Sequence, residues 1–177
     1  WGGRESDQFR GEWVNATISR NFVYNMGYTN PNHVDFVSIG VAGGQAPCFN
    51  VVIERNWVEQ TDTNYDNSLG NDGTDYHGLD LTNVIRRNNV FIGLAHGINP
   101  LGMDGPKVHN NLFYRVSGSP TITYGGSGGS PLAIDFRNNI FFECGLDSGN
   151  TNQGWYKNTN GTVCTMAAMN YNFVCGS

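Results

Sequence analysis

A segment rich in carboxylates is the densest group of chemically active side chains in this sequence. Five Asp residues lie within the 19 residues from Asp62 to Asp80. Carboxylate oxygens at this density suit a hard cation such as Ca²⁺. The segment begins like an EF-hand loop, but its sixth position is Asn67 and its twelfth is Gly73, so that motif fails. We expect either a solvated, turn-rich loop without metal or a calcium site formed by Asp66, Asp72, Asp75 and Asp80.

Two short segments that begin with His form a second group. His77-Gly-Leu-Asp80 and His96-Gly-Ile-Asn99 are similar tetrapeptides, and Lys107 and His109 follow them. His and Lys act as general bases when their surroundings bring their pKa close to the working pH. The alternative is that these residues are polar strand positions that face solvent.

A repeat must position both groups. An apolar stretch, one or two polar residues, an Asn and two large apolar residues recur six times. The repeated Asn residues are 35, 33, 22, 28 and 33 residues apart. β-branched and aromatic residues flank each Asn, which favours strands over helices. The unit is therefore strand, bend, strand, and its six Asn residues are Asn21, Asn56, Asn89, Asn111, Asn139 and Asn172.

The repeated Asn is expected to form the bend. Asn adopts the left-handed αL conformation more readily than other residues that have a side chain. Stacked bends would align the amides, which could then hydrogen-bond along the stack as a ladder. A β-sandwich would also alternate strands and turns, but its hairpins do not require the same Asn in each copy. The pattern therefore indicates a solenoid of parallel strands.

Aromatic residues fall into two sets. Those that follow the bend are predicted to stack in the core. The others could form a surface that stacks on sugars, or could simply cover the core. The first set is Phe22, Trp57, Phe91, Phe113, Phe141, Phe142 and Phe173, and the second is Trp1, Trp13, Tyr28, Tyr65, Tyr76, Trp155 and Tyr156.

These Asn repeats resemble the right-handed parallel β-helix of the pectate-lyase-like superfamily over nearly the whole chain. The resemblance implies an all-β fold of about six coils. It also implies a single β-helix domain over residues 1–177, which could be a portion of a longer chain. Each coil needs a first strand upstream of the repeat, expected within 33–39, 76–81, 96–101 and 121–124. Protruding loops are expected at 40–48, 60–75, 125–131 and 145–162.

In enzymes with this fold, the resemblance implies a groove along the first strands that binds an anionic polysaccharide. Abstraction of a proton beside a uronate carboxylate needs a base and a cation that stabilises the enolate. His77 or Lys107 could be the base, with His96 on the same face, and Arg86, Arg87 or Arg115 could face the carboxylate. The motifs of polygalacturonases and classical pectate lyases are missing, so no single lyase family is indicated. The enzyme, if it is one, would be a polysaccharide lyase or hydrolase.

Composition excludes several other classes. Asn and Gly together make up about 27% of the 177 residues, which argues against a helix-rich fold. Only 2 Lys and 8 Arg, with a net charge of −5, leave no basic surface typical of nucleic-acid binding. No apolar run reaches the roughly 18 residues that a membrane span needs. We expect a secreted or cell-surface protein whose partner is a polysaccharide.

A structural role is the competing hypothesis. No amphipathic cap is evident for either end of the stack, so the ends could meet other subunits or flanking domains. The chain would then be an adhesive or structural β-helix that stacks end to end in a fibre, filament or tailspike. Four cysteines are too few for a disulfide scaffold. Cys48 is expected to be a free core thiol, and one bridge among the others would most simply join Cys164 to Cys175.

Overall fold

The structure is a computed structural model that describes part of the chain. The described residues are 8–11, 13–24, 36–39, 48–60, 74–76, 81–94, 103–104, 107–116, 122–123, 134–144, 157–158, 166–170 and 173–175. All regular structure in these ranges is β-strand. Within the same ranges, no helix is long and apolar enough to cross a membrane.

The strands pair in parallel and form three main sheets. Sheet A consists of β1 (Phe9–Gly11), β4 (Val37–Ile39) and β7 (Thr74–Tyr76). Sheet B follows the order β2 (Thr17–Ser19), β5 (Cys48–Glu54), β8 (Leu81–Arg87), β11 (Lys107–His109), β14 (Ile134–Arg137) and β17 (Met166–Asn170), and β10 (Met103–Asp104) also pairs with β8. Sheet C follows the order β3 (Phe22–Tyr24), β6 (Trp57–Glu59), β9 (Val90–Ile92), β12 (Leu112–Tyr114), β15 (Ile140–Phe142) and β18 (Phe173–Cys175). A further parallel pair joins β13 (Ile122–Thr123) to β16 (Lys157–Asn158).

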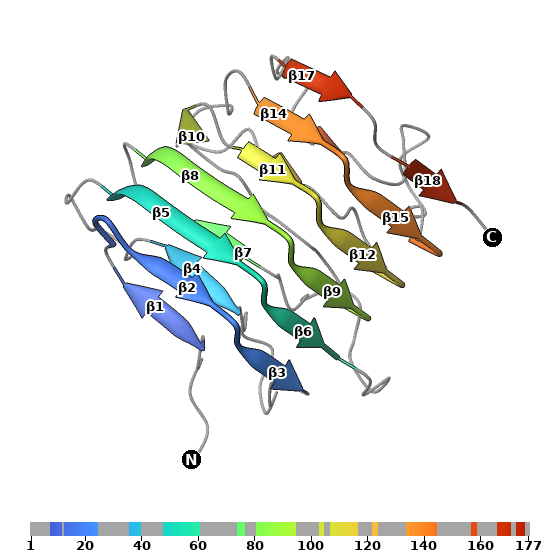
Figure 1. Cartoon of the computed structure of the whole chain (residues 1–177), viewed down its shortest axis with the longest axis horizontal. Coiled ribbons are helices and arrows are strands. Elements are labelled where there is room, and N and C mark those ends of the chain that lie inside the picture. The colour runs from blue at the N-terminus through green and yellow to red at the C-terminus, as the bar shows by residue number, and fades with distance from the viewer. Residues whose placement is uncertain are drawn as a thin grey trace.

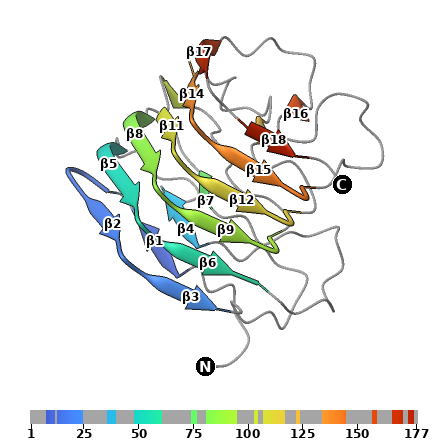
Figure 2. The ribbon, with the colours of Figure 1, turned by 45° about the vertical axis from the view of Figure 1, so that its right-hand side comes forward.

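Sheets B and C stack their strands in the same order. Each strand of sheet B except β10 continues, after two residues, into a strand of sheet C, so the two sheets lie side by side along one bend (Figure 1, Figure 2). Parallel pairing without a hairpin requires the chain to return to its starting side between successive pairs. This all-β arrangement of stacked parallel strands fits a β-helix.

The predicted Asn ladder is confirmed from Asn21 to Asn139. The Nδ2 of each of the first four ladder Asn residues donates to the Oδ1 of the next Asn at 2.9–3.0 Å. The backbone N–H groups of the first four Asn residues donate to the same oxygens at 3.0–3.1 Å. Nδ2 also reaches a strand carbonyl, for example that of Val108 from Asn139 at 2.9 Å. The ladder therefore satisfies polar groups that would be costly to bury unpaired.

The prediction that the ladder Asn itself adopts αL is wrong. The residue just before it does, with φ between 53° and 58° at Arg20, Arg55, Asn88, Asn110 and Asn138. Turning the chain at this preceding residue leaves the ladder Asn pointing inward, where its amide can reach its neighbours. Two adjacent residues therefore have separate roles: the first bends the chain, and the second contributes its amide to the ladder.

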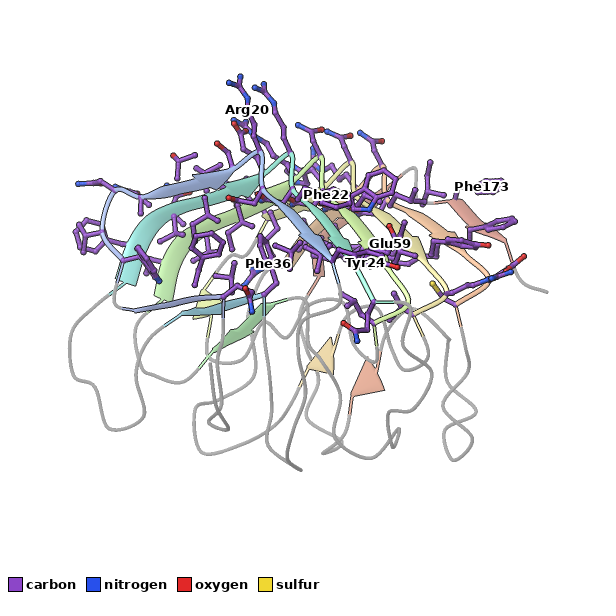
Figure 3. All side chains as sticks on the ribbon, turned by 90° about the horizontal axis from the view of Figure 1, so that it is seen from below. Arg20, Phe22, Tyr24, Phe36, Glu59 and Phe173 are labelled. Atoms are coloured by element: carbon purple, nitrogen blue, oxygen red, sulfur yellow. The ribbon has the colours of Figure 1, made fainter. Side chains whose placement is uncertain are left out.

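The core lies on the inner sides of the sheets. Phe91, Phe113 and Phe141 are fully buried and stack along sheet C, with ring centroids 5.3 and 4.9 Å apart. Phe36, which precedes β4, lies on the inner side of sheet B, as Figure 3 shows. Phe91, Phe113 and Phe141 confirm part of the predicted aromatic core.

Four other aromatic residues of the predicted core are exposed instead. Phe22, Trp57, Phe142 and Phe173 project from the outer side of sheet C. In a strand, alternate residues face opposite sides, and only the middle residue faces inward in β3, β6, β9, β12 and β15. The prediction treated both residues after the bend as core, and the alternation allows only one.

The first strands are shorter than predicted. β4 covers only 37–39 of the segment 33–39, and β7 ends at Tyr76, where the predicted strand 76–81 begins. Residues 77–80 lie outside the described residues. Leu81 instead opens β8 of sheet B, opposite Cys48. β13 lies within the predicted strand 121–124, while 96–101 lies outside the described residues.

The predicted loops end earlier than expected in three places. Cys48 begins β5, Thr74 and Asp75 lie in β7, and β16 interrupts 145–162. Among the cysteines whose side chains are described, Cys144 is a free thiol that donates to the carbonyl of Phe113 at 3.4 Å, and burial raises its pKa. Cys164 lies outside the described residues, so the Cys164–Cys175 bridge stays a prediction.

Candidate functional site

The outer side of sheet B and the bend beside it carry most of the charged side chains that the structure describes. Strand alternation places two rows there, because Ile18 and its register partners face the core. One row runs through Ser19, Glu54, Arg87, His109 and Arg137, and the other contains Thr17, Val52, Ile85, Lys107 and Asp135. We call these ten residues the polar face.

A second exposed row follows the bend between sheets B and C. It consists of the five αL residues that precede the ladder Asn residues, and we call it the corner row: Arg20, Arg55, Asn88, Asn110 and Asn138. Figure 3 shows Arg20 projecting from the outer side of the bend. Because the ladder holds the backbone of each bend, these side chains are presented at the strand spacing of about 4.8 Å.

Two carboxylates pair with cationic side chains of the polar face. Arg87 Nε donates to Glu54 Oε2 at 2.7 Å, and this hydrogen bond lowers the pKa of Glu54 below its usual range. Asp135 lies between two partners, with Arg137 Nε 2.5 Å from Oδ1 and His109 Nε2 3.2 Å from Oδ2. Arg87 and Arg137 are therefore held in place, each by a neighbouring carboxylate.

The charge of this region is opposite to that of the chain. Arg20, Arg55, Arg87, Lys107 and Arg137 are five of the ten Lys and Arg residues, whereas Glu54 and Asp135 are only two of the fifteen Asp and Glu residues. The polar face and corner row thus carry +5 − 2 = +3 with His neutral, in a chain whose net charge is −5. A surface with a net positive charge attracts anionic ligands.

Two of the predicted catalytic residues lie on the polar face. Lys107 is half-buried on β11 and lies opposite Ile85, while Arg87 is exposed on β8 and lies opposite His109. The two are therefore diagonal neighbours on adjacent strands. They project from sheet B, whereas the groove expected from the resemblance follows the first strands.

The other candidate arginines point elsewhere. Arg86 is fully buried, because it faces inward between the two outward positions of β8. Arg115 follows β12 at the far edge of sheet C, where its Nε donates to Glu143 at 2.7 Å. Neither residue shares a surface with Lys107.

The remaining predicted site residues lie outside the described ranges. These are His77, His96, Asp66, Asp72 and Asp80. Asp75 is described only as part of the backbone of β7 in sheet A. Among the described side chains, no group of three or more His, Cys, Asp or Glu residues could hold a metal ion.

Sequence reasoning missed the corner row and a second, exposed ladder. Asn50 Nδ2 donates to Asn15 Oδ1 and Asn83 Nδ2 to Asn50 Oδ1, both at 2.8 Å, and all three residues are αL. The signal was a fixed interval, because each of these residues lies six positions before a ladder Asn. For the corner row, the signal was the polar residue just before each ladder Asn.

Comparison with models of known protein families, with curated proteins and with solved structures finds no match for this chain.

Proposed function

We propose that this chain is a right-handed parallel β-helix of about six coils, of the pectate-lyase-like kind, that binds an acidic polysaccharide outside the cell. The binding surface is the polar face with its corner row. The observation that carries the proposal is the net charge of +3 on this surface.

The geometry of the surface suits an extended polyanion. Its side chains recur at the strand spacing of about 4.8 Å along the stack, so a linear ligand can meet equivalent positions on successive strands. Arg20 and Arg55 are exposed at adjacent bends and lie next to the polar face. Guanidinium groups bind carboxylates and sulfates through paired N–H donors, which favours the anionic groups of such a polymer.

Binding is better supported than cleavage. β-Elimination needs a base and also a cation that is available to the substrate carboxylate. Lys107 could serve as a base on this face, but Arg87 and Arg137 are each held by a carboxylate. Polysaccharide binding is therefore the proposed function, and lyase activity is a further property to be assayed. Calcium at the acidic segment 62–80 stays a prediction, which binding measurements with and without calcium would address.

The test replaces the exposed corner cations without disturbing the bend. Arg20→Asn/Arg55→Asn keeps the αL conformation, because Asn88, Asn110 and Asn138 already occupy the equivalent positions with φ between 53° and 57°. Each lost contact is worth about 0.5–1 kcal/mol, so the double variant should bind oligogalacturonate about 5- to 30-fold more weakly by calorimetry. Added salt should also weaken the binding of oligogalacturonate to the wild-type protein, because salt screens the charges on both.

Arg115→Asn is the matched control. It removes one such charge from an αL residue (φ 51°) at another edge of sheet C, so its affinity should stay within about twofold of wild type. Equal affinity of the double variant and wild type, or equal binding of a neutral glucan, would contradict the proposal. Ultraviolet absorbance of unsaturated products in the same mixtures would reveal lyase activity, and Lys107→Ala would show whether that activity depends on this face.

A further inference from the structure

The outer side of sheet C is apolar along its whole described length. Strand register arranges its outward residues in two rows. One row contains Phe22, Trp57, Val90, Leu112, Ile140 and Phe173, and the other contains Tyr24, Glu59, Ile92, Tyr114 and Phe142. We call these eleven residues the apolar face. Glu59 is its one ionisable carboxylate.

The apolar face contrasts with the polar face across the bend. Sheet B has a mainly apolar inner row and mainly polar outer rows, as a sheet with one solvated face does. Each strand of sheet C instead begins with two large apolar residues after the ladder Asn, as in Asn139-Ile-Phe-Phe142. Continuous apolar strands are typical of parallel sheets that are covered on both faces. Both sheets belong to one chain, so the difference indicates a partner for sheet C.

The exposed area is large enough for a protein interface. Six of its side chains are 40–70% exposed: Phe22 70%, Phe173 60%, Tyr24 54%, Ile140 45%, Trp57 40% and Phe142 40%. At about 200 Å² for each large side chain, they expose roughly 600 Å². This is the upper end of the largest apolar patch of an ordinary monomer, about 300–600 Å². Two such patches would bury roughly 1,200 Å², the lower end for a specific protein–protein interface.

Ring packing disfavours a sugar as the occupant. Phe22 and Trp57 stack with centroids 6.3 Å apart and an interplanar angle of 28°, and Tyr114 and Phe142 lie 5.6 Å apart at 35°. Rings that stack on one another along the strands cover each other's faces and present their edges. A carbohydrate platform needs open ring faces, whereas edges and aliphatic groups pack against other apolar side chains.

Charge favours a second copy of the same chain. Glu59 Oε2 accepts a hydrogen bond from Trp57 Nε1 at 2.8 Å, so its charge is held within the face. At the edge, Arg115 lies 4.9 Å above the Tyr114 ring and pairs with Glu143. Two apolar faces can therefore approach with little repulsion, whereas two polar faces of charge +3 would repel each other.

We propose that the apolar face docks against the apolar face of a second copy in a two-fold dimer. Such a contact is isologous, so the same residues serve both subunits, and the two sheets would pack about 10 Å apart. The polar faces stay outside this interface, which leaves both available to ligand.

The test measures mass by light scattering after size exclusion, over a wide range of protein concentration. Wild type should have about twice the chain mass of 19.4 kDa. Trp57→Thr/Phe142→Thr should shift the dimer to monomer, with a dissociation constant raised at least about 100-fold, because symmetry removes four aromatic side chains from the contact. Thr is favoured in strands, so the fold should persist.

The matched control is Val52→Thr/Ile85→Thr on the outer side of sheet B, which should remain dimeric. If Trp57→Thr/Phe142→Thr loses its cooperative thermal transition, Phe22→Thr/Phe173→Thr takes its place, since these two residues are the most exposed of the face. A wild type that stays at 19.4 kDa at every concentration would overturn the proposal. So would a dimer or filament that persists in both apolar-face variants.

Discussion

At the scale of single residues, the ladder Asn residues contribute most to the described fold. Asn111 accepts from the N–H and the Nδ2 of Asn89, and its own Nδ2 donates to Asn139 Oδ1 and to the Arg86 carbonyl. Asn111 is about 1% exposed, so water cannot replace its amide as a hydrogen-bond partner for these groups. Removing its amide leaves several buried groups without a partner.

Asn111→Ala should therefore lower the free energy of unfolding by about 3–5 kcal/mol, since each unpaired buried group costs about 1–3 kcal/mol. Urea denaturation measures this change. The control is the adjacent, exposed Asn110→Gly, which keeps the αL conformation (φ 55°) and should change stability by less than about 1 kcal/mol. Similar losses for the two variants would show that the ladder is not the stabilising element.

The ladder could be predicted from sequence, but the residue that bends the chain could not. Six copies of an Asn at comparable positions indicate a shared role. The αL residue before it is Arg in two bends and Asn in three, and Arg has little preference for that conformation. Its backbone is set by the hydrogen bonds of the stack, and these depend on strands far apart in the sequence.

At the scale of elements, the sequence predicts the strands that flank each bend. It does not fully predict which side of the sheet each residue faces. Strand alternation gives two sides, but three apolar residues in succession do not say which side is the core. Burial resolves this at Phe113, which is buried, and at Phe142, which is exposed. The short strands of sheet A were placed only approximately, because Gly-rich segments give a weak strand signal.

The positive charge of the corner row can be increased by a substitution. Asn88→Arg should strengthen oligogalacturonate binding about 2- to 5-fold, because it adds a cation next to Arg55 at the strand spacing, worth about 0.5–1 kcal/mol. Arg20 and Arg55 show that this bend accepts Arg, at φ 58° and 56°. Calorimetric titration checks the gain.

Asn83→Arg provides the comparison within the same strand. Asn83 is also exposed and αL (φ 53°), but it lies at the other end of β8, away from the corner row. Its substitution should leave affinity within about twofold of wild type. An equal gain from both variants would mean that overall charge, and not the corner row, governs binding.

At the scale of the whole molecule, the described surface is divided into faces of different chemistry. The polar face and corner row carry +3, the apolar face carries one paired carboxylate, and the bend with its Asn ladder separates them. Composition alone could not predict this division, because the net charge of −5 averages over all faces. Only the strand register shows that residues far apart in sequence share one face.

The candidate site was predictable only in part for the same reason. Lys107 and Arg87 were selected from their chemistry, and register places them on adjacent strands with His109 and Asp135. Arg20 and Arg55 are not singled out by the sequence, because their importance depends on the stacking of two distant repeats. His77, His96 and the acidic segment stay predictions.

The most direct measurement maps the bound polysaccharide by two-dimensional nitrogen–proton NMR of the labelled wild-type protein titrated with oligogalacturonate. We expect the largest shift changes in β5, β8, β11 and in the bends at Arg20 and Arg55, with little change in the strands of sheet C. Changes confined to sheet C, or no saturable change at low salt, would contradict polysaccharide binding on the polar face.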